Sequence, residues 1–145
     1  MPKVQIQSTD IEYAESDVIT FDEGLVGLPH LRRLVIVSQP EIHPFLWLAS
    51  VEEPETAFLV LEPRIQFSDY APSVPPQVRA RLGMAEREEP LLLAIARITS
   101  DWQCSSLNLR APLVIAPSVM HGTQVVLTES AYRLEEPLAV LAAAA

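Results

Sequence analysis

The sequence contains a single cysteine, Cys104, among its 145 residues. Because there is no second cysteine, an intrachain disulfide is excluded, and such a chain suits a reducing compartment. No hydrophobic run approaches the ~20 apolar residues that a membrane-spanning helix requires. Residues 1–7 contain no apolar stretch of signal-peptide length. These absences predict a cytoplasmic protein that does not enter a membrane.

Basic residues are scarce, and Lys3 is the only lysine. Ten basic residues oppose nineteen acidic ones, so the net charge is −9. Between Val4 and Leu31 there are six acidic residues and no lysine or arginine. Such a surface disfavours direct nucleic-acid binding, which rests on neutralising phosphates. It favours a basic protein partner, because opposite potentials accelerate association, although acidic clusters also serve solubility alone.

Motifs for catalysis, phosphate binding and metal binding are missing as well. The four glycines form no phosphate-binding loop, and there is no Gly-x-Ser-x-Gly. His30, His43 and His121 each lie beside a turn residue and, like Cys104, stand singly rather than in the close pairs that zinc ligands form. We therefore expect no enzymatic activity, no metal and no cofactor, with surface histidines and a Cys104 that packs as a small residue.

What the chain does contain is a succession of short apolar or alternating segments, punctuated by thirteen prolines. Proline cannot donate to a β-ladder, so each proline marks a strand boundary, an edge or a turn. Many short strands with frequent turn residues are typical of a sandwich or a small barrel. The predicted strands are Val4–Gln7, Val18–Phe21, Leu34–Val37, Phe45–Ser50, Thr56–Leu61, Leu91–Ile98, Leu113–Ile115 and Gln124–Thr128.

One segment departs from this β pattern. Prolines follow Ser73 at its start, Gly83 stands at its end, and Val78 and Leu82 lie four residues apart on one face. We predict one short helix at about 75–83. The tail from about residue 134 favours helix in composition but has poorly patterned apolar residues, so we expect it to be helical or frayed. The chain is otherwise undivided, which predicts a single mainly β domain over residues 1–145.

The most informative stretch is an acidic turn between two apolar segments. Residues 45–50 and 56–61 flank Glu52-Glu53-Pro54-Glu55, which predicts a β-hairpin with an acidic tip. Glu52, Glu53 and Glu55 are either a solvated turn or a prong that meets arginines on a partner, where carboxylate–guanidinium pairs can be bidentate.

Other positions are candidates for contact with a partner. Asp22 and Glu23 add to the same negative field. Asp69 and Tyr70 lie in a loop, where tyrosine is a common interface anchor but can equally lie half buried. Asn108 either holds its own loop or faces a partner. Gly24 and Gly27 are expected to supply backbone freedom for a turn that follows Phe21.

Four segments occur in the same order, and at similar spacing, as the motifs of one known family. They are Phe21-Asp22-Glu23-Gly24-Leu25-Val26-Gly27-Leu28, the stretch Pro44–Pro63, Leu107-Asn108-Leu109-Arg110-Ala111-Pro112-Leu113-Val114-Ile115, and Gln124-Val125-Val126-Leu127 followed by Tyr132. From about Val4 to Pro137 the chain resembles the bacterial flagellar assembly factor FliW family. Leu28 replaces a usual aromatic residue, and the tail lacks the usual basic residue before Pro137.

The resemblance implies a compact antiparallel β-barrel-like domain that acts as a non-enzymatic regulator with two mutually exclusive partners. One partner is flagellin before its export. The other is CsrA, a small basic RNA-binding dimer that represses translation of the flagellin message. Release from flagellin would free the factor to bind CsrA and relieve repression. The residues themselves leave open an acidic β-domain that binds another basic or hydrophobic protein, or a barrel that binds a small ligand.

Overall fold

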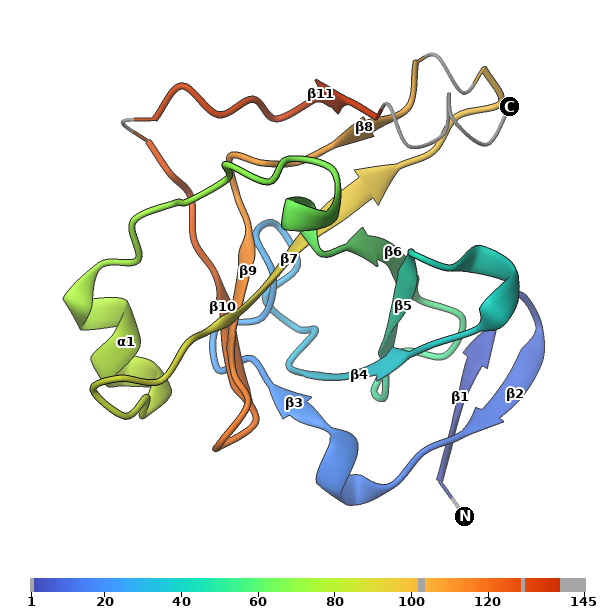
Figure 1. The fold of residues 1–145 in the computed structure, drawn as a ribbon. Coiled ribbons are helices and arrows are strands. Elements are labelled where there is room, and N and C mark those ends of the chain that lie inside the picture. Colours follow the sequence, from blue (N-terminus) through green and yellow to red (C-terminus); the bar gives the residue numbers. More distant parts are fainter. Residues whose placement is uncertain (1, 102–103, 129, 139–145) are drawn as a thin grey trace.

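The computed structural model describes residues 2–101, 104–128 and 130–138. Seven of its strands close into a barrel (Figure 1). Closure occurs because β10 pairs with β3 while β9 pairs with both β10 and β7. Around the ring the strands are β3 (Ile19–Thr20), β4 (Arg33–Val37), β5 (Leu46–Ser50), β6 (Ala57–Leu61), β7 (Leu91–Arg97), β9 (Leu113–Ala116) and β10 (His121–Gln124).

The remaining elements cover the outside of this barrel. The hairpin of β1 (Lys3–Ile6) and β2 (Thr9–Glu12) packs against β5, and the one α-helix of the described residues, α1 (Pro76–Leu82), lies beside β10 (Figure 1). The end of β7 pairs with β8 (Ser106–Leu107), which pairs with β11 (Glu136–Pro137). Single 3-10 turns occur at Glu15–Asp17, Pro40–Ile42 and Pro63–Ile65. Over the described residues, no helix has the length and apolar character needed to cross a membrane.

Strands β4 and β5 carry continuous apolar runs, Leu34–Val37 and Leu46–Ala49, because both of their faces are covered. In β4, Leu34 packs into the barrel interior, whereas Val35 and Val37 pack on the outer face beneath the β1–β2 hairpin. In β5, Leu48 belongs to the interior cluster and Ala49 to the outer one. Side chains of a strand point alternately to opposite faces, so a wall buried on both sides loses the usual apolar–polar alternation.

The short helix is confirmed, and it covers another part of the outer face. Val78 and Leu82 are buried in a cluster with Tyr70 and Leu138. The helix ends at Gly83, whose φ of +74° is the left-handed conformation that glycine tolerates best at a helix C-terminus. Its first turn follows Pro75 and has no side-chain cap, so Ser73, two residues earlier, does not cap the helix.

The prediction of a mainly β, barrel-like fold is confirmed, and three details are corrected. The β10–β3 pairing is parallel, so the barrel is not wholly antiparallel. The sequence analysis did not predict strands β2, β8 and β11. Each has only two to four residues and lacks the apolar or alternating pattern of a strand. The last predicted strand is displaced: β10 ends at Gln124, although the N–H groups of Val125 and Leu127 still donate to Pro112 O and Arg110 O.

The tail begins as ordered structure rather than as helix or frayed chain. Glu136 and Pro137 pair with Leu107 and Ser106, and Leu138 is buried. The tail pairs with β8, a strand that the pattern of residues did not predict. The prediction of a helical or frayed tail therefore rested on composition alone. Residues 139–145, on which most of that prediction falls, lie outside the described residues.

Candidate protein-binding surface

Several of the predicted contact residues converge on one end of the barrel. Thr20 pairs with Arg33 at the end of β3 and the start of β4, and Ala49 pairs with Ala57 at the end of β5 and the start of β6. Gln124 pairs with Leu113 at the end of β10 and the start of β9. We call this end the barrel mouth: it carries the loops 22–32 and 51–56, the segment 108–112, and Gln124.

The loop 22–32 folds over the mouth and closes it with apolar side chains. Leu25 and Leu31 are buried against the barrel interior, and Leu25 and Leu28 exchange two main-chain hydrogen bonds of 3.1 and 2.8 Å. The N–H of Val26 donates to Gln124 Oε1 at 2.8 Å, which ties the loop to β10. This arrangement leaves the Val26 side chain outside, 59% exposed.

The acidic turn at 51–56 is built around a buried serine. Ser50 Oγ accepts the N–H groups of Glu52 and Glu53 at 3.1 and 2.9 Å, and the N–H of Ser50 donates to Thr56 O at 2.9 Å. Serine hydroxyls commonly stabilise turns in this way. The prediction of a β-hairpin with an acidic tip is confirmed by the β5–β6 pairing.

Glu52 has a structural role at this tip. Its Oε1 accepts the N–H groups of both Arg32 and Arg33 at 2.7 Å. The carboxylate thereby joins the β5–β6 turn to the start of β4, although Glu52 itself is exposed. Charge-assisted hydrogen bonds of this kind are stronger than neutral ones.

We predict that Glu52→Gln lowers the free energy of unfolding by about 1 kcal/mol, because a neutral amide oxygen is a weaker acceptor than a carboxylate. The matched variant is Glu55→Gln, since Glu55 lies on the same turn and no hydrogen bond or ion pair involves it within the described chain. Urea unfolding of both variants measures the difference. Equal stability of the two would contradict the anchoring role of Glu52.

Glu53 and Glu55 are the acids of the turn whose carboxylates accept no main-chain N–H group among the described residues. Glu53 Oε2 accepts from Thr56 Oγ1 at 3.1 Å and lies 3.4 Å from His30 Nε2. Glu55 is exposed and has φ of +74°. The left-handed conformation is uncommon for a residue with a Cβ, and it places Glu55 at the tip of the turn.

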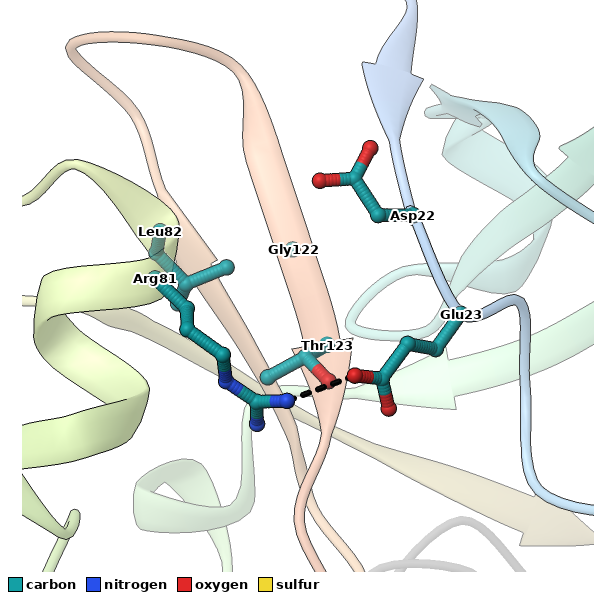
Figure 2. Close-up of a pocket in the computed structure, with 6 residues that line it drawn as sticks. All are labelled: Asp22, Glu23, Arg81, Leu82, Gly122 and Thr123. Atoms are coloured by element: carbon teal, nitrogen blue, oxygen red, sulfur yellow. Dashed lines mark hydrogen bonds and ion pairs between the residues drawn. The ribbon is translucent and has the colours of Figure 1, made fainter.

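Asp22 and Glu23 begin the loop 22–32 and line a hollow together with Arg81 and Leu82 of α1. Arg81 reaches from α1 to Glu23 across Thr123, at 2.5 Å between Nη1 and Oε1, while Asp22 stands apart from this pair (Figure 2). Asp22 Oδ2 lies 3.9 Å from His121 Nδ1. The hollow between these residues has a volume of 40 Å³, which suits a water molecule rather than a ligand.

Tyr70 and Asn108 have structural roles in this chain. Tyr70 is 2% exposed, its hydroxyl donates to Leu109 O at 2.8 Å, and its ring meets Tyr132 edge-on with 4.6 Å between ring centroids. The interface-anchor interpretation of Tyr70 is therefore wrong, because the side chain lies within the fold. Asn108 Oδ1 accepts from the N–H groups of Arg110 and Ala111, so Asn108 holds its own loop. Asp69 is exposed in the adjacent loop.

The three histidines and Cys104 belong to no metal-binding cluster in the part of the chain that the structure describes. Within residues 2–101, 104–128 and 130–138, no group of three or more histidine, cysteine or acidic side chains is arranged to hold a metal ion. Cys104 is exposed, with Sγ 3.7 Å from Asp101 Oδ2, which corrects the expectation that it packs as a small residue. The preceding strand β7 ends at Arg97, so Cys104 lies in a loop rather than in the core.

Sequence analysis missed an apolar groove that opens at the mouth. It has a volume of 390 Å³, and its lining includes Leu28, Phe58 and Ile95 together with the exposed side chains Val26, Val126 and Leu134. The last three are 59%, 45% and 56% exposed. They come from separate segments, and no local pattern in the sequence indicates that they meet.

The chain matches the family model described as FliW protein over residues 4–138. It is 33% identical over 129 residues to the flagellar assembly factor FliW of Syntrophotalea carbinolica, an alignment that covers 89% of this chain and 91% of the relative. It is also 35% identical over 123 residues to the flagellar assembly factor FliW of Symbiobacterium thermophilum, covering 84% of this chain and 89% of the relative.

The fold agrees with these sequence matches. A crystal structure of the flagellar assembly factor FliW superimposes with a TM-score of 0.84 and 28% sequence identity. The superposition covers 93% of this chain and 95% of that one. The similarity thus extends over the barrel and its outer elements together.

Proposed function

This chain belongs to the FliW family of flagellar assembly factors, and on that premise we propose that it is a non-enzymatic, single-domain regulator that acts in the cytoplasm. In this proposal it binds flagellin before export and, once released, binds CsrA and relieves the repression of flagellin synthesis. The observation that carries the proposal, beside the family itself, is the acidic turn at the barrel mouth, where Glu53 and Glu55 are exposed.

The charge of the chain supports a basic partner of the CsrA type. With a net charge of −9, the protein attracts a basic surface and accelerates encounter with it. A bound acidic turn also repels RNA phosphates within roughly 8–10 Å at physiological salt, which is the Debye length. Repression would then be relieved without this protein mimicking RNA in the RNA-binding site of CsrA.

Calorimetry tests the proposal directly. The full chain is titrated with flagellin and with CsrA from its own source organism, at low and at moderate salt. We expect binding to each partner, exclusion of one partner by the other, and weaker CsrA binding at higher salt because screening reduces the attraction. Absence of binding to both partners would refute the proposal.

We predict that the double variant Glu53→Lys/Glu55→Lys weakens CsrA binding by about tenfold at low salt and flattens its salt dependence. Glu52 is left intact, since its carboxylate holds the main chain of Arg32 and Arg33. The readout is the dissociation constant as a function of salt concentration.

The matched control is Glu41→Lys/Glu62→Lys, which changes the net charge by the same amount. Both residues are exposed at the opposite end of the barrel, in the turn after β4 and directly after β6. If the two double variants lose CsrA affinity equally, the effect comes from net charge and the acidic turn has no specific role.

A further inference from the structure

The apolar groove at the barrel mouth is the strongest unassigned feature of the molecule. Exposed large apolar side chains among the described residues are Val26, Ile65, Ile98, Val119, Val126 and Leu134. Three of the six line this one groove. Single exposed apolar residues need no explanation, but a contiguous apolar patch with a polar rim is typical of a protein-binding surface.

The polar groups of the groove favour an apolar occupant over a polar small molecule. Gln124 is engaged at both ends of its amide, accepting from Val26 N–H and donating to Ala111 O. Asn108 Oδ1 accepts two main-chain N–H groups. Across the described residues, no buried side-chain nitrogen or oxygen lacks a hydrogen-bond partner. A polar ligand would find little to pair with, whereas apolar side chains would gain burial.

The two strands beneath the groove offer no edge for strand addition. Phe58 lies on β6, which pairs with β5 and β7, and Ile95 lies on β7, which pairs with β6, β8 and β9. Neither strand offers a free edge, so over β6 and β7 a partner segment would bind through its side chains. A helix meets that requirement, because residues at i, i+3, i+4 and i+7 present one apolar face to a groove.

The rim supplies the charge complementarity. The acidic turn adjoins the groove, since Phe58 follows Glu55 by three residues and Glu53 lies 3.4 Å from the His30 ring, two residues after Leu28. On another side, a hollow lined by Glu23 shares Leu25, Val26 and Gln124 with the groove. Helix residues that flank the apolar face would meet these carboxylates.

We propose that this groove binds an amphipathic helix of a partner protein, with its apolar face on Val26, Val126 and Leu134 and its flanking lysines or arginines on Glu53 and Glu55. The inference deepens the proposed function by assigning one surface to partner binding. It predicts that apolar contact and charge contribute separately to the affinity for the partner. Substitutions in the groove should remove the apolar contribution, and substitutions in the acidic turn should remove the charge contribution.

The test uses Val26→Ser/Leu134→Gln, which removes apolar area from the groove without changing the charge. The matched control is Val119→Ser/Ile65→Gln, at side chains that are 43% and 55% exposed away from the groove. Because all four positions are on the surface, thermal unfolding should show both double variants folded. We expect the groove variant alone to weaken binding to flagellin or to CsrA roughly tenfold or more.

Methyl NMR tests the groove independently of these two partners. An amphipathic helical peptide of leucine and lysine is added to the full chain, beside a leucine–glutamate peptide of the same pattern. We expect the leucine–lysine peptide alone to perturb the methyl signals of Val26, Val126 and Leu134, and the perturbation to disappear in the groove variant. Perturbation by both peptides alike, or at Ile65 and Val119 instead, would overturn the inference.

The two experiments separate the proposals. Groove perturbation by the leucine–lysine peptide without binding of flagellin or CsrA would refute the proposed function and leave the groove assignment standing. Binding of either partner that is equal in the groove variant and the control, with no groove perturbation by the peptide, would refute the groove assignment and leave the proposed function standing.

Discussion

Gly24→Ala is expected to lower the free energy of unfolding by more than about 3 kcal/mol, because it combines backbone strain with overlap against main-chain atoms. Gly24 has φ of +67°, and a Cβ there would lie 2.6 Å from Leu28 O and from Pro29 C and Cα. Main-chain atoms cannot move aside as a flexible side chain does, so the loop 22–32 would have to shift. Urea unfolding monitored by fluorescence measures the loss.

The same loop offers a matched control in Gly27. Its φ of +77° imposes similar strain, but a Cβ there would meet nothing within 4 Å. Gly27→Ala should therefore cost only about 1–2 kcal/mol, which is the penalty of the left-handed conformation. A comparable loss in both variants would show that backbone conformation alone accounts for Gly24 and that its close approach to Pro29 is relaxed in solution.

Tyr70→Ala is expected to destabilise the protein by about 3–5 kcal/mol, the range for truncating a large buried aromatic side chain. Tyr70 packs in the cluster that joins α1, β8 and the start of the tail to the barrel. Tyr70→Phe should cost about 1–2 kcal/mol, because Leu109 O loses the hydroxyl that donates to it at 2.8 Å. Tyr132→Phe is the control: its hydroxyl accepts the N–H of Ala71 at an exposed position and should matter less.

The Tyr70 hydroxyl also predicts a loss of stability at high pH. Burial raises the pKa of Tyr70, and neighbouring Tyr132 raises it further. The neutral phenol is thus favoured in the folded state, so its contribution is complete below the usual tyrosine value of about 10 and falls as the pH rises above it. Tyr70→Phe should flatten this alkaline decline. If Tyr70→Phe loses stability at high pH as the unsubstituted protein does, the titration of other groups causes that loss.

The structure redistributes the roles of the acidic residues. Glu52 has the attributes of an accessible acid in the sequence, yet it holds the main chain of Arg32 and Arg33. Glu23 shares its charge with Arg81, from a helix 58 residues away in the chain. Reversing Glu53 and Glu55 therefore changes the charge of the turn without breaking the contacts that Glu52 and Glu23 make, which is why the charge-reversal test is restricted to them.

The sequence by itself determined the class of the fold and much of its local structure. Proline positions delimit strands, the run before and after the acidic turn forms the β5–β6 hairpin, and Gly83 ends the helix, because each depends on the conformational preference of neighbouring residues. The motifs that resemble the FliW family agree with the family match over residues 4–138.

Only the tertiary structure decided which residues meet. Contacts between distant segments produce the parallel pairing of β3 with β10, the pairing of β11 with β8, and the burial of Tyr70. The groove is the clearest case, since Val26, Val126 and Leu134 lie in separate segments of the sequence and become one surface only when the barrel closes. Local propensity acts over a few residues, whereas a binding surface is formed by side chains that closure of the sheet brings together.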